Sequence, residues 1–344
     1  MLLAIGTAVW AADVTEFPDR LGGRVTAGWA GQWQRADLLQ DDVHVSERHV
    51  SRQGFDLGLE FAPVRVLAAT LHLETVPSLI IDYPDSVPMI FEPLSGAGSY
   101  PTTETAPAPY RVEGSGVSGL WLGVAAAPWS ESRNESHAGS WRLDVAFRPG
   151  SKGKNLWTGP IDARGVAAGG SALRFSGAFS RTRGQGEPWV AVGGRIENRA
   201  EIDLTDIDGT DLAKAVLLRA ASRFHLAGGV SWRPIDNEDN TLALGPTASA
   251  SWDTWADHAS GVWLPNTLEA GRTIPVTSGE TVTGAAGALV RATVGGFGVR
   301  ANFDVALTTP HHPEHLYEVS TQGTRGVSAG LQFSYRQGFA GTNP

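Results

Sequence analysis

The sequence has no cysteine among its 344 residues, which excludes a disulfide framework and any chemistry that needs a thiolate. It also lacks a run of about eighteen apolar residues, so no transmembrane helix is expected. Lysine is nearly absent, and arginine therefore carries almost all of the positive charge. The formal net charge of -9 argues against nucleic acid as a partner. Nucleophile-elbow, Walker and dinucleotide-binding motifs are missing too, as are internal repeats.

The sequence is instead rich in glycine and tryptophan, with 42 Gly, 12 Trp and only 18% charged residues. Such a composition, combined with many evenly spaced strands, is typical of β-barrels. The clearest pattern runs over 216–233, where apolar side chains alternate with polar ones that include Arg219, Arg223 and His225. A helix is the rival interpretation for the first half of this stretch, but Val230 and Trp232 keep the period of two. The stretch therefore predicts one long strand in the wall of a membrane barrel.

The same alternation predicts twelve strands, which are joined alternately by long loops and short turns. The expected strands are 24–34, 55–61, 67–74, 120–126, 141–148, 173–182, 190–197, 216–233, 242–253, 282–294, 299–307 and 327–336. The expected long loops are 38–52, 76–116, 149–170, 198–212, 256–280 and 309–324. Bacterial barrels have even strand numbers, short periplasmic turns and long extracellular loops. We therefore expect an all-β fold, a single closed antiparallel up-and-down transmembrane barrel with every long loop outside.

The ends of the chain predict export and flanking segments. Residues 2–10 form a short apolar run that ends at a small-x-small site, although a basic region before it is missing. A buried first strand is the alternative for this run. The expected organisation is a signal-peptide remnant at 1–11, a periplasmic N-terminal segment at 12–23, the outer-membrane barrel at 24–339 and a C-terminal tail at 340–344.

Two stretches carry a resemblance to a known class of proteins. The last strand, GVSAGLQFSYRQGF, is similar to the terminal signal of Gram-negative outer-membrane β-barrel proteins, with spaced apolar residues and a final aromatic residue, Phe339. It departs from that signal by the residues 340–344 that follow. GLWLGVAAAPW and WRLDVAF resemble porin-like barrels of the small-solute channel kind, including those grouped with phenol-degradation and fatty-acid uptake proteins. The resemblance implies a location in the bacterial outer membrane and contact with its lipid.

If the apolar faces meet lipid, the alternate positions line the lumen, and these carry more arginines than carboxylates. The candidate lumen-lining residues are Arg24, Asp56, Glu60, His72, Glu74, Arg142, Asp144, Arg148, Arg174, Arg195, Glu197, Arg219, Arg223, His225, Arg233, Asp253, Arg291, Arg300, Asp304 and Arg336. A surplus of arginine would favour anions in any passage that stays open. The alternative is that the charges pair across the lumen and fill it, since twelve strands lie between filled and open barrels.

Three functions are compatible with these features. The leading one is a porin-like channel for passive passage of a small solute, with an anionic solute favoured by the arginines and the 76–116 loop as a constriction or lid. A second is a structural or docking barrel whose partners are other envelope proteins. A third is a lipid-modifying barrel enzyme, for which His72 and His225 are the candidate bases, although neither has a serine partner in the sequence. We expect a protein that is not an enzyme.

Two acidic or histidine-rich loops could hold a metal ion. The stretch DIDGTD, 206–211, resembles part of a calcium loop, but the final bidentate Glu is absent. The stretch HHPEH, 311–315, could ligate a transition metal, but a proline interrupts it. Ordinary solvated loops are the favoured interpretation of both, and the sequence predicts neither a metal nor a cofactor.

Overall fold

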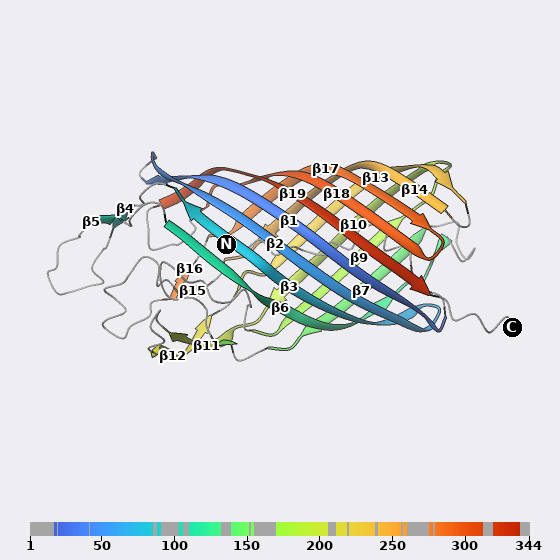
Figure 1. The fold of residues 1–344 in the computed structure, drawn as a ribbon, viewed down its shortest axis with the longest axis horizontal. Coiled ribbons are helices and arrows are strands. Elements are labelled where there is room, and N and C mark those ends of the chain that lie inside the picture. The colour runs from blue at the N-terminus through green and yellow to red at the C-terminus, as the bar shows by residue number, and fades with distance from the viewer. Residues whose placement is uncertain are drawn as a thin grey trace.

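The computed structural model is an all-β molecule, and its barrel runs lengthwise through Figure 1. The structure describes residues 17–18, 20–40, 42–84, 88–90, 103–105, 110–131, 139–150, 153–154, 170–205, 211–218, 220–237, 240–255, 257–259, 275–277, 279–311 and 319–337. The expected signal-peptide remnant and C-terminal tail lie outside these residues. Within them, no helix is long and apolar enough to cross a membrane.

Twelve strands form one closed antiparallel barrel, which confirms the predicted fold. They are β1 (Gly22–Gln40), β2 (Val43–Val64), β3 (Leu67–Tyr83), β6 (Tyr110–Ala126), β7 (Ser140–Arg148), β9 (Ala172–Ser180), β10 (Gly186–Glu197), β13 (Arg223–Asp236), β14 (Asn240–Asp253), β17 (Thr281–Val294), β18 (Phe297–Thr308) and β19 (Val319–Gln337). Each pairs with its neighbours in chain order, and β1 pairs with both β19 and β2 to close the sheet. Closure leaves no unpaired sheet edge, which a backbone surrounded by hydrocarbon requires.

Short strands gather at one end of the barrel, which we call the loop end (Figure 1). They are β4 (Pro88–Ile90) paired with β5 (Thr103–Thr105), β15 (Asp257–Ala259) paired with β16 (Pro275–Thr277), and a sheet of β8 (Gly153–Lys154), β11 (Ala200–Thr205) and β12 (Asp211–Leu218). The opposite end, which we call the turn end, holds tight turns such as Gly295-Gly296 between β17 and β18. At that turn Gly295 has φ 57°, a conformation that glycine adopts without strain.

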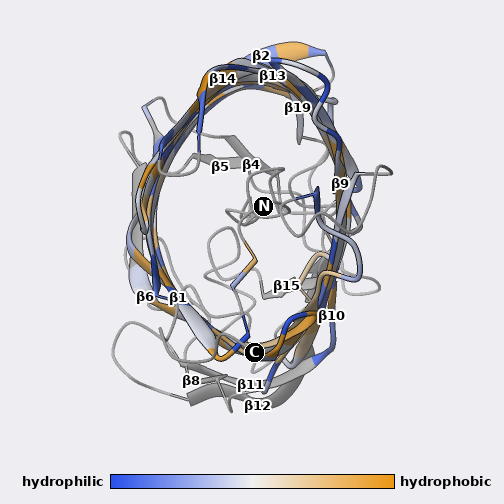
Figure 2. Ribbon diagram, turned by 90° about the vertical axis from the view of Figure 1, so that its right-hand side faces the viewer, coloured by the Kyte–Doolittle hydropathy of each residue, from blue (hydrophilic) through white to orange (hydrophobic). Residues whose placement is uncertain are grey.

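The side chains of the barrel strands alternate between the outer surface and the interior, and the apolar ones point outward. On β7, Leu143 is 49% exposed whereas its neighbour Arg142 is 3% exposed. On β18, Phe303 is 52% exposed and Arg300 is buried. The strands form one closed ring (Figure 2), and their outward side chains make an apolar surface around it. A soluble protein buries such residues, so this surface is the one that meets lipid.

Aromatic side chains form a girdle at each margin of the apolar surface. Near the turn end, the rings of Phe297 and Tyr335 lie 4.6 Å apart between centroids. Near the loop end, Phe224 stacks on Trp252 at 5.5 Å. Rings of aromatic residues at both interfaces are typical of transmembrane barrels. The two girdles therefore mark the limits of the membrane-spanning part.

The predicted single strand over 216–233 is wrong, because the chain changes sheets near Ser222. Strand β12 ends at Leu218 and pairs with β11, and the barrel strand β13 begins at Arg223. Ser222 is bonded to the ends of two other barrel strands: its hydroxyl accepts from the Glu197 amide at 3.0 Å, and its carbonyl accepts from the Thr254 amide at 2.9 Å. These bonds hold the chain at the barrel rim. The alternation continues across them because both segments are extended.

The predicted loop at 38–52 is also wrong, because β1 and β2 form one long hairpin. The connection is only Asp41-Asp42, and Asp42 has φ 61°. Aspartate tolerates this conformation at two-residue hairpin turns. The hairpin continues beyond the lipid-facing surface, where water surrounds it and no apolar alternation is needed. The expectation that every connection at the loop end is long therefore fails for the first one.

The predicted loop at 76–116 is shorter than expected. Strand β3 continues to Tyr83 and β6 begins at Tyr110. The apolar residues at its start belong to β3, where Val76 and Leu79 are buried and pack with Val50 and Ile81. They therefore cover the inside of the extended wall. Of the loop that remains, the structure describes Pro84 and the short strands β4 and β5.

Candidate functional site

The candidate site is the interior of the barrel, where charged and polar side chains lie among alanines and a few larger apolar residues. Most of the sequence-predicted residues lie there. Those buried are Arg24, Glu60, Arg142, Arg148, Glu197, Arg223, Asp253, Arg291, Arg300 and Asp304. Those partly buried are Asp56, His72, Glu74, Asp144, Arg174, Arg195, His225 and Arg233. Arg336 is exposed at the turn end of β19, and Arg219 lies outside the described residues.

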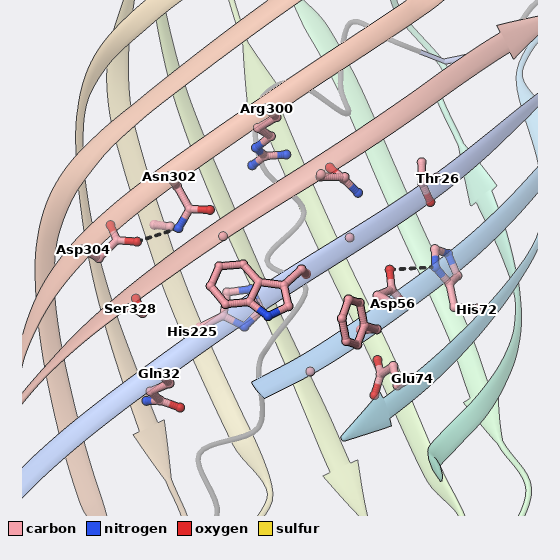
Figure 3. Close-up of a pocket in the computed structure, with 18 of the residues that line it drawn as sticks. Thr26, Gln32, Asp56, His72, Glu74, His225, Arg300, Asn302, Asp304 and Ser328 are labelled. Carbon is pink, nitrogen blue, oxygen red and sulfur yellow. Dashed lines mark hydrogen bonds and ion pairs between the residues drawn. The ribbon is translucent and has the colours of Figure 1, made fainter. Parts of the chain in front are cut away.

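A cavity of about 330 Å³ lies inside the barrel, lined by residues of every barrel strand except β10. Small residues make room for it on β1, β2 and β19, among them Gly28, Ala30, Gly54 and Ser328. At Gly58 a β-carbon would crowd the Thr26 hydroxyl and the His72 ring, so a larger residue there would displace those side chains. Polar groups of Gln32, His225, Arg300, Asn302 and Asp304 point toward the same space (Figure 3).

A buried ion-pair network closes the cavity toward the turn end. Glu60 on β2 accepts two hydrogen bonds of 3.0 Å from Arg24 on β1, and a further one from Arg142 on β7. Arg142 also donates to Asp144 at 2.7 Å. The Glu60 side chain is 3% exposed. A carboxylate this deeply buried needs its guanidinium partners, so the network forms a fixed cross-connection between strands.

A second network lies on the wall opposite β1, toward the loop end. Arg174 on β9 reaches Glu74 on β3 at 3.0 Å, and Glu197 on β10 accepts from Arg148 at 2.6 Å and lies 2.9 Å from Arg195. The guanidinium groups of Arg148 and Arg174 stack over the buried Trp121 ring, at 5.2 and 4.8 Å. Arg223 and Asp253, directly opposite in the sheet, pair at 2.5 Å. Most carboxylates here are therefore already engaged by arginine.

A third network centres on Glu187, which the sequence interpretation missed. Its carboxylate accepts from Arg291 at 3.1 Å and lies 3.5 Å from Arg233. The residue precedes the expected strand at 190–197, whereas β10 begins at Gly186. The available signal was the spacing of two between Glu187 and Trp189, which puts both side chains on the same face of a strand. The Trp189 side chain is also buried. Arg52 was missed for a similar reason, because it fell in the expected loop at 38–52 and lies on β2 at the cavity.

The pairing changes the expected charge of the lumen. Six arginines and five carboxylates line the cavity: Arg24, Arg52, Arg142, Arg174, Arg223, Arg300, Asp56, Glu60, Glu74, Asp144 and Asp304. The sequence predicted a surplus of about four arginines. The difference arises because Arg148, Arg195, Arg233 and Arg291 do not line the cavity. The charges that line the cavity are therefore nearly balanced.

The first described residues of the chain occupy the turn end of the interior. Phe17 and Pro18 are buried, and Phe17 packs against Ala62, Ala68 and two further inward-facing alanines. The Arg142 guanidinium lies 5.7 Å from the Phe17 ring centroid, within the range of a cation–π contact. These two residues of the expected periplasmic segment thus enter the barrel and contact its buried ion-pair network.

The candidate catalytic and metal-binding groups are placed as follows. His72 Nδ1 lies 3.8 Å from Asp56 Oδ2 at the cavity wall (Figure 3), and His225 faces the same cavity. His311 is buried, and its Nδ1 lies 2.8 Å from the Thr321 hydroxyl. The rest of the histidine-rich loop, 312–315, and residues 206–210 of the acidic loop lie outside the described residues.

Comparisons with known proteins find likeness in structure only. No protein-family model and no curated protein matches the sequence. A Pseudomonas aeruginosa FadL homologue is 10% identical with a TM-score of 0.43, covering 94% of this chain and 92% of its own. The β-domain of the Bordetella autotransporter BrkA is 15% identical with a TM-score of 0.41, covering 91% and 98%. The P. putida toluene transporter TodX is 10% identical with a TM-score of 0.35, covering 97% and 95%.

The protein is a membrane-spanning barrel of the outer-membrane type. Its outer surface is apolar between two aromatic girdles, its interior is polar and its sheet is closed. Single-chain antiparallel barrels with these features are the architecture of proteins in bacterial outer membranes. On β18, the distance from Phe297 to Leu307 is about 33 Å of strand, or about 25 Å along the axis at the usual tilt. That height matches the apolar band of such barrels.

Proposed function

We propose that the protein is a channel for passive passage of a small polar solute across the outer membrane. The observation that carries the proposal is the cavity of about 330 Å³ inside a closed barrel, lined by both hydrogen-bond donors and acceptors. Amide, hydroxyl and charged groups on the lining replace the hydration of a polar solute, and the alanines among them contact its carbon atoms. The surplus of one arginine over the carboxylates that line the cavity gives the passage a weak preference for anions.

The expected route runs along the β19–β1–β2 wall, where side chains are small. Its narrow point is the network of Arg24, Glu60 and Arg142 with Phe17 below it. A passing solute would exchange hydrogen bonds with the cavity wall and would have to displace or pass Phe17. Binding groups that are numerous and individually weak allow both entry and exit.

Two tryptophan substitutions at adjacent positions of β19 test the channel. Ser328→Trp places a large ring in the cavity, whereas Val327→Trp places the same ring on the lipid-facing side. Pure protein in a planar bilayer should conduct, Ser328→Trp should lower the single-channel conductance several-fold, and Val327→Trp should leave it unchanged. Absence of current from the natural protein, or equal conductance in the two variants, would overturn the proposal.

A docking barrel is the second candidate, and one observation favours it. Three ion-pair networks, Trp121, Trp189 and Phe17 fill much of the interior. A barrel that anchors other envelope proteins needs no open passage. Absence of conductance in the bilayer experiment, together with a stable complex isolated by cross-linking in native membranes, would support this function over the channel.

A further inference from the structure

The β1–β2 hairpin extends past the membrane band at the loop end, and its outer face carries a compact group of ligating side chains. Strand partners place Arg35 opposite His49, Asp37 opposite Glu47 and Leu39 opposite His44. Trp33 and Ser51 form the preceding row, next to the lipid-facing surface. The group thus lies outside the lumen and outside the apolar band.

Asp37 and Glu47 are like-charged residues directly opposite each other on neighbouring strands. Such pairs destabilise a sheet unless a cation offsets the repulsion. Arg35 offsets part of this repulsion, because its guanidinium donates to Glu47. His49 Nε2 lies 3.0 Å from the other Glu47 oxygen.

Two register shifts on either side of Asp37 turn the neighbouring side chains toward one another. One lies between Arg35 and Asp37 against β19, and the other lies between Leu38 and Leu39 against β2. Extra residues of this kind re-aim side chains and are frequent beside functional sites. As a result, one ligand atom each from Asp37, His44 and Glu47 lies within 4.8 Å of the other two.

The geometry points to a site for a divalent transition metal of the zinc class, held by Asp37, His44 and Glu47. One imidazole and two carboxylates suit such ions, whereas calcium and magnesium prefer oxygen ligands alone. Tetrahedral zinc at its usual bond lengths places ligand atoms about 3.4 Å apart. Because the three ligand atoms already lie within 4.8 Å of one another, shifts of little more than 1 Å would bring them to that spacing.

Arg35 and His49 act as outer partners of this site. Each forms a hydrogen bond with Glu47, and such partners orient a ligating carboxylate without binding the ion. The bound metal would join β1 to β2 two to five residues from the tip of the longest barrel hairpin, through ligands from both strands. Metal binding would therefore stabilise this hairpin, which the membrane does not support.

Titration of the detergent-folded full-length protein with Zn²⁺ tests the site. Calorimetry should show one saturable equivalent, with affinity reduced about tenfold or more in each of His44→Ala and Asp37→Asn. All positions are outside the membrane band, so folding can be checked by resistance to unfolding in detergent gels. Mg²⁺ at the same concentration should not compete.

The histidine-rich stretch at 311–315 provides the matched control, because it holds the other candidate imidazoles. The double variant His312→Ala with His315→Ala should bind Zn²⁺ as the natural protein does. The proposal is overturned if no saturable binding occurs, if His44→Ala and Asp37→Asn bind normally, or if binding is lost in the double variant instead. None of these outcomes depends on whether the barrel conducts.

Discussion

The guanidinium of Arg174 on β9 donates to the carboxylate of Glu74 on β3 over 3.0 Å, although the two residues are 100 positions apart and their strands are not neighbours. Two further strands, β7 and β6, separate them in the wall. The bond therefore crosses the interior. It shows how the lumen of this barrel pairs its arginines, and it gives a direct way to change the charge that a solute would meet.

Neutralising Glu74 should make the passage more selective for anions. Glu74→Gln leaves Arg174 without its carboxylate beside the cavity, and the local potential becomes more positive. The reversal potential in a salt gradient should shift toward that of a more anion-permeable channel. Arg174→Gln should shift it in the opposite direction, and Asp236→Asn, an exposed charge change at the turn end, should leave it unchanged.

Neutralising Glu60 should destabilise the whole barrel. Glu60→Gln leaves Arg24 and Arg142 buried with one carboxylate fewer, and breaking a buried pair in this way costs about 3–5 kcal/mol. The free energy of unfolding, measured by urea titration in lipid vesicles, should fall by that amount. Asp236→Asn, which removes a partly exposed partner of Arg233, should change it by less than about 1 kcal/mol. Equal effects would show that the Glu60 network does not hold the strands together.

A charge placed on the lipid-facing surface should lower the free energy of unfolding by an amount that depends on its depth in the membrane. Phe303 lies midway along β18, and Phe297 begins the strand at the turn-end girdle. Phe303→Arg should lower the free energy of unfolding in vesicles by about 2–4 kcal/mol, and Phe297→Arg by about 0–1 kcal/mol. A similar small effect at both positions would contradict the placement of the band.

Removing the Phe17 ring should widen the turn end of the passage. Phe17→Ala deletes the side chain that packs on Ala62 and Ala68 beneath the Arg142 network. Single-channel conductance should rise, while the barrel keeps its resistance to unfolding because its strands are untouched. Phe333→Ala, the same substitution on the outer surface and away from the cavity, serves as the control and should not alter conductance. Unchanged conductance in Phe17→Ala would mean that the narrow point lies elsewhere.

Much of the barrel could be predicted from local sequence pattern. The lipid-facing side of β18 reads directly from Val299, Phe303 and Leu307, because a strand in contact with lipid on one side and a polar interior on the other must alternate. Beyond the membrane no such constraint acts on the side chains, and there the prediction of strands failed. The β1–β2 hairpin meets water beyond the membrane, shows no apolar alternation, and was therefore mistaken for a loop.

The change of sheet at Ser222 had no signal in the alternation, because β12 and β13 are both extended and share a period of two. The bonds from Ser222 to the ends of β10 and β14 decide where the barrel strand starts. Glu187 was missed because the start of β10 resembles a turn, with Gly184, Gly186 and Pro188 nearby.

By itself, the sequence determined the class of fold, the number of barrel strands and the side of each membrane strand that faces lipid. These follow because each strand faces lipid on one side and the barrel interior on the other, whatever its neighbours are. Only the tertiary structure decided which charges meet, how much space they leave and where the chain leaves the wall. Closing the barrel brings Arg291 to Glu187, and Arg174 to Glu74, across strands that the chain order does not place together. Those contacts, and hence the balance of charge in the lumen, depend on barrel diameter and strand stagger, which no local pattern encodes.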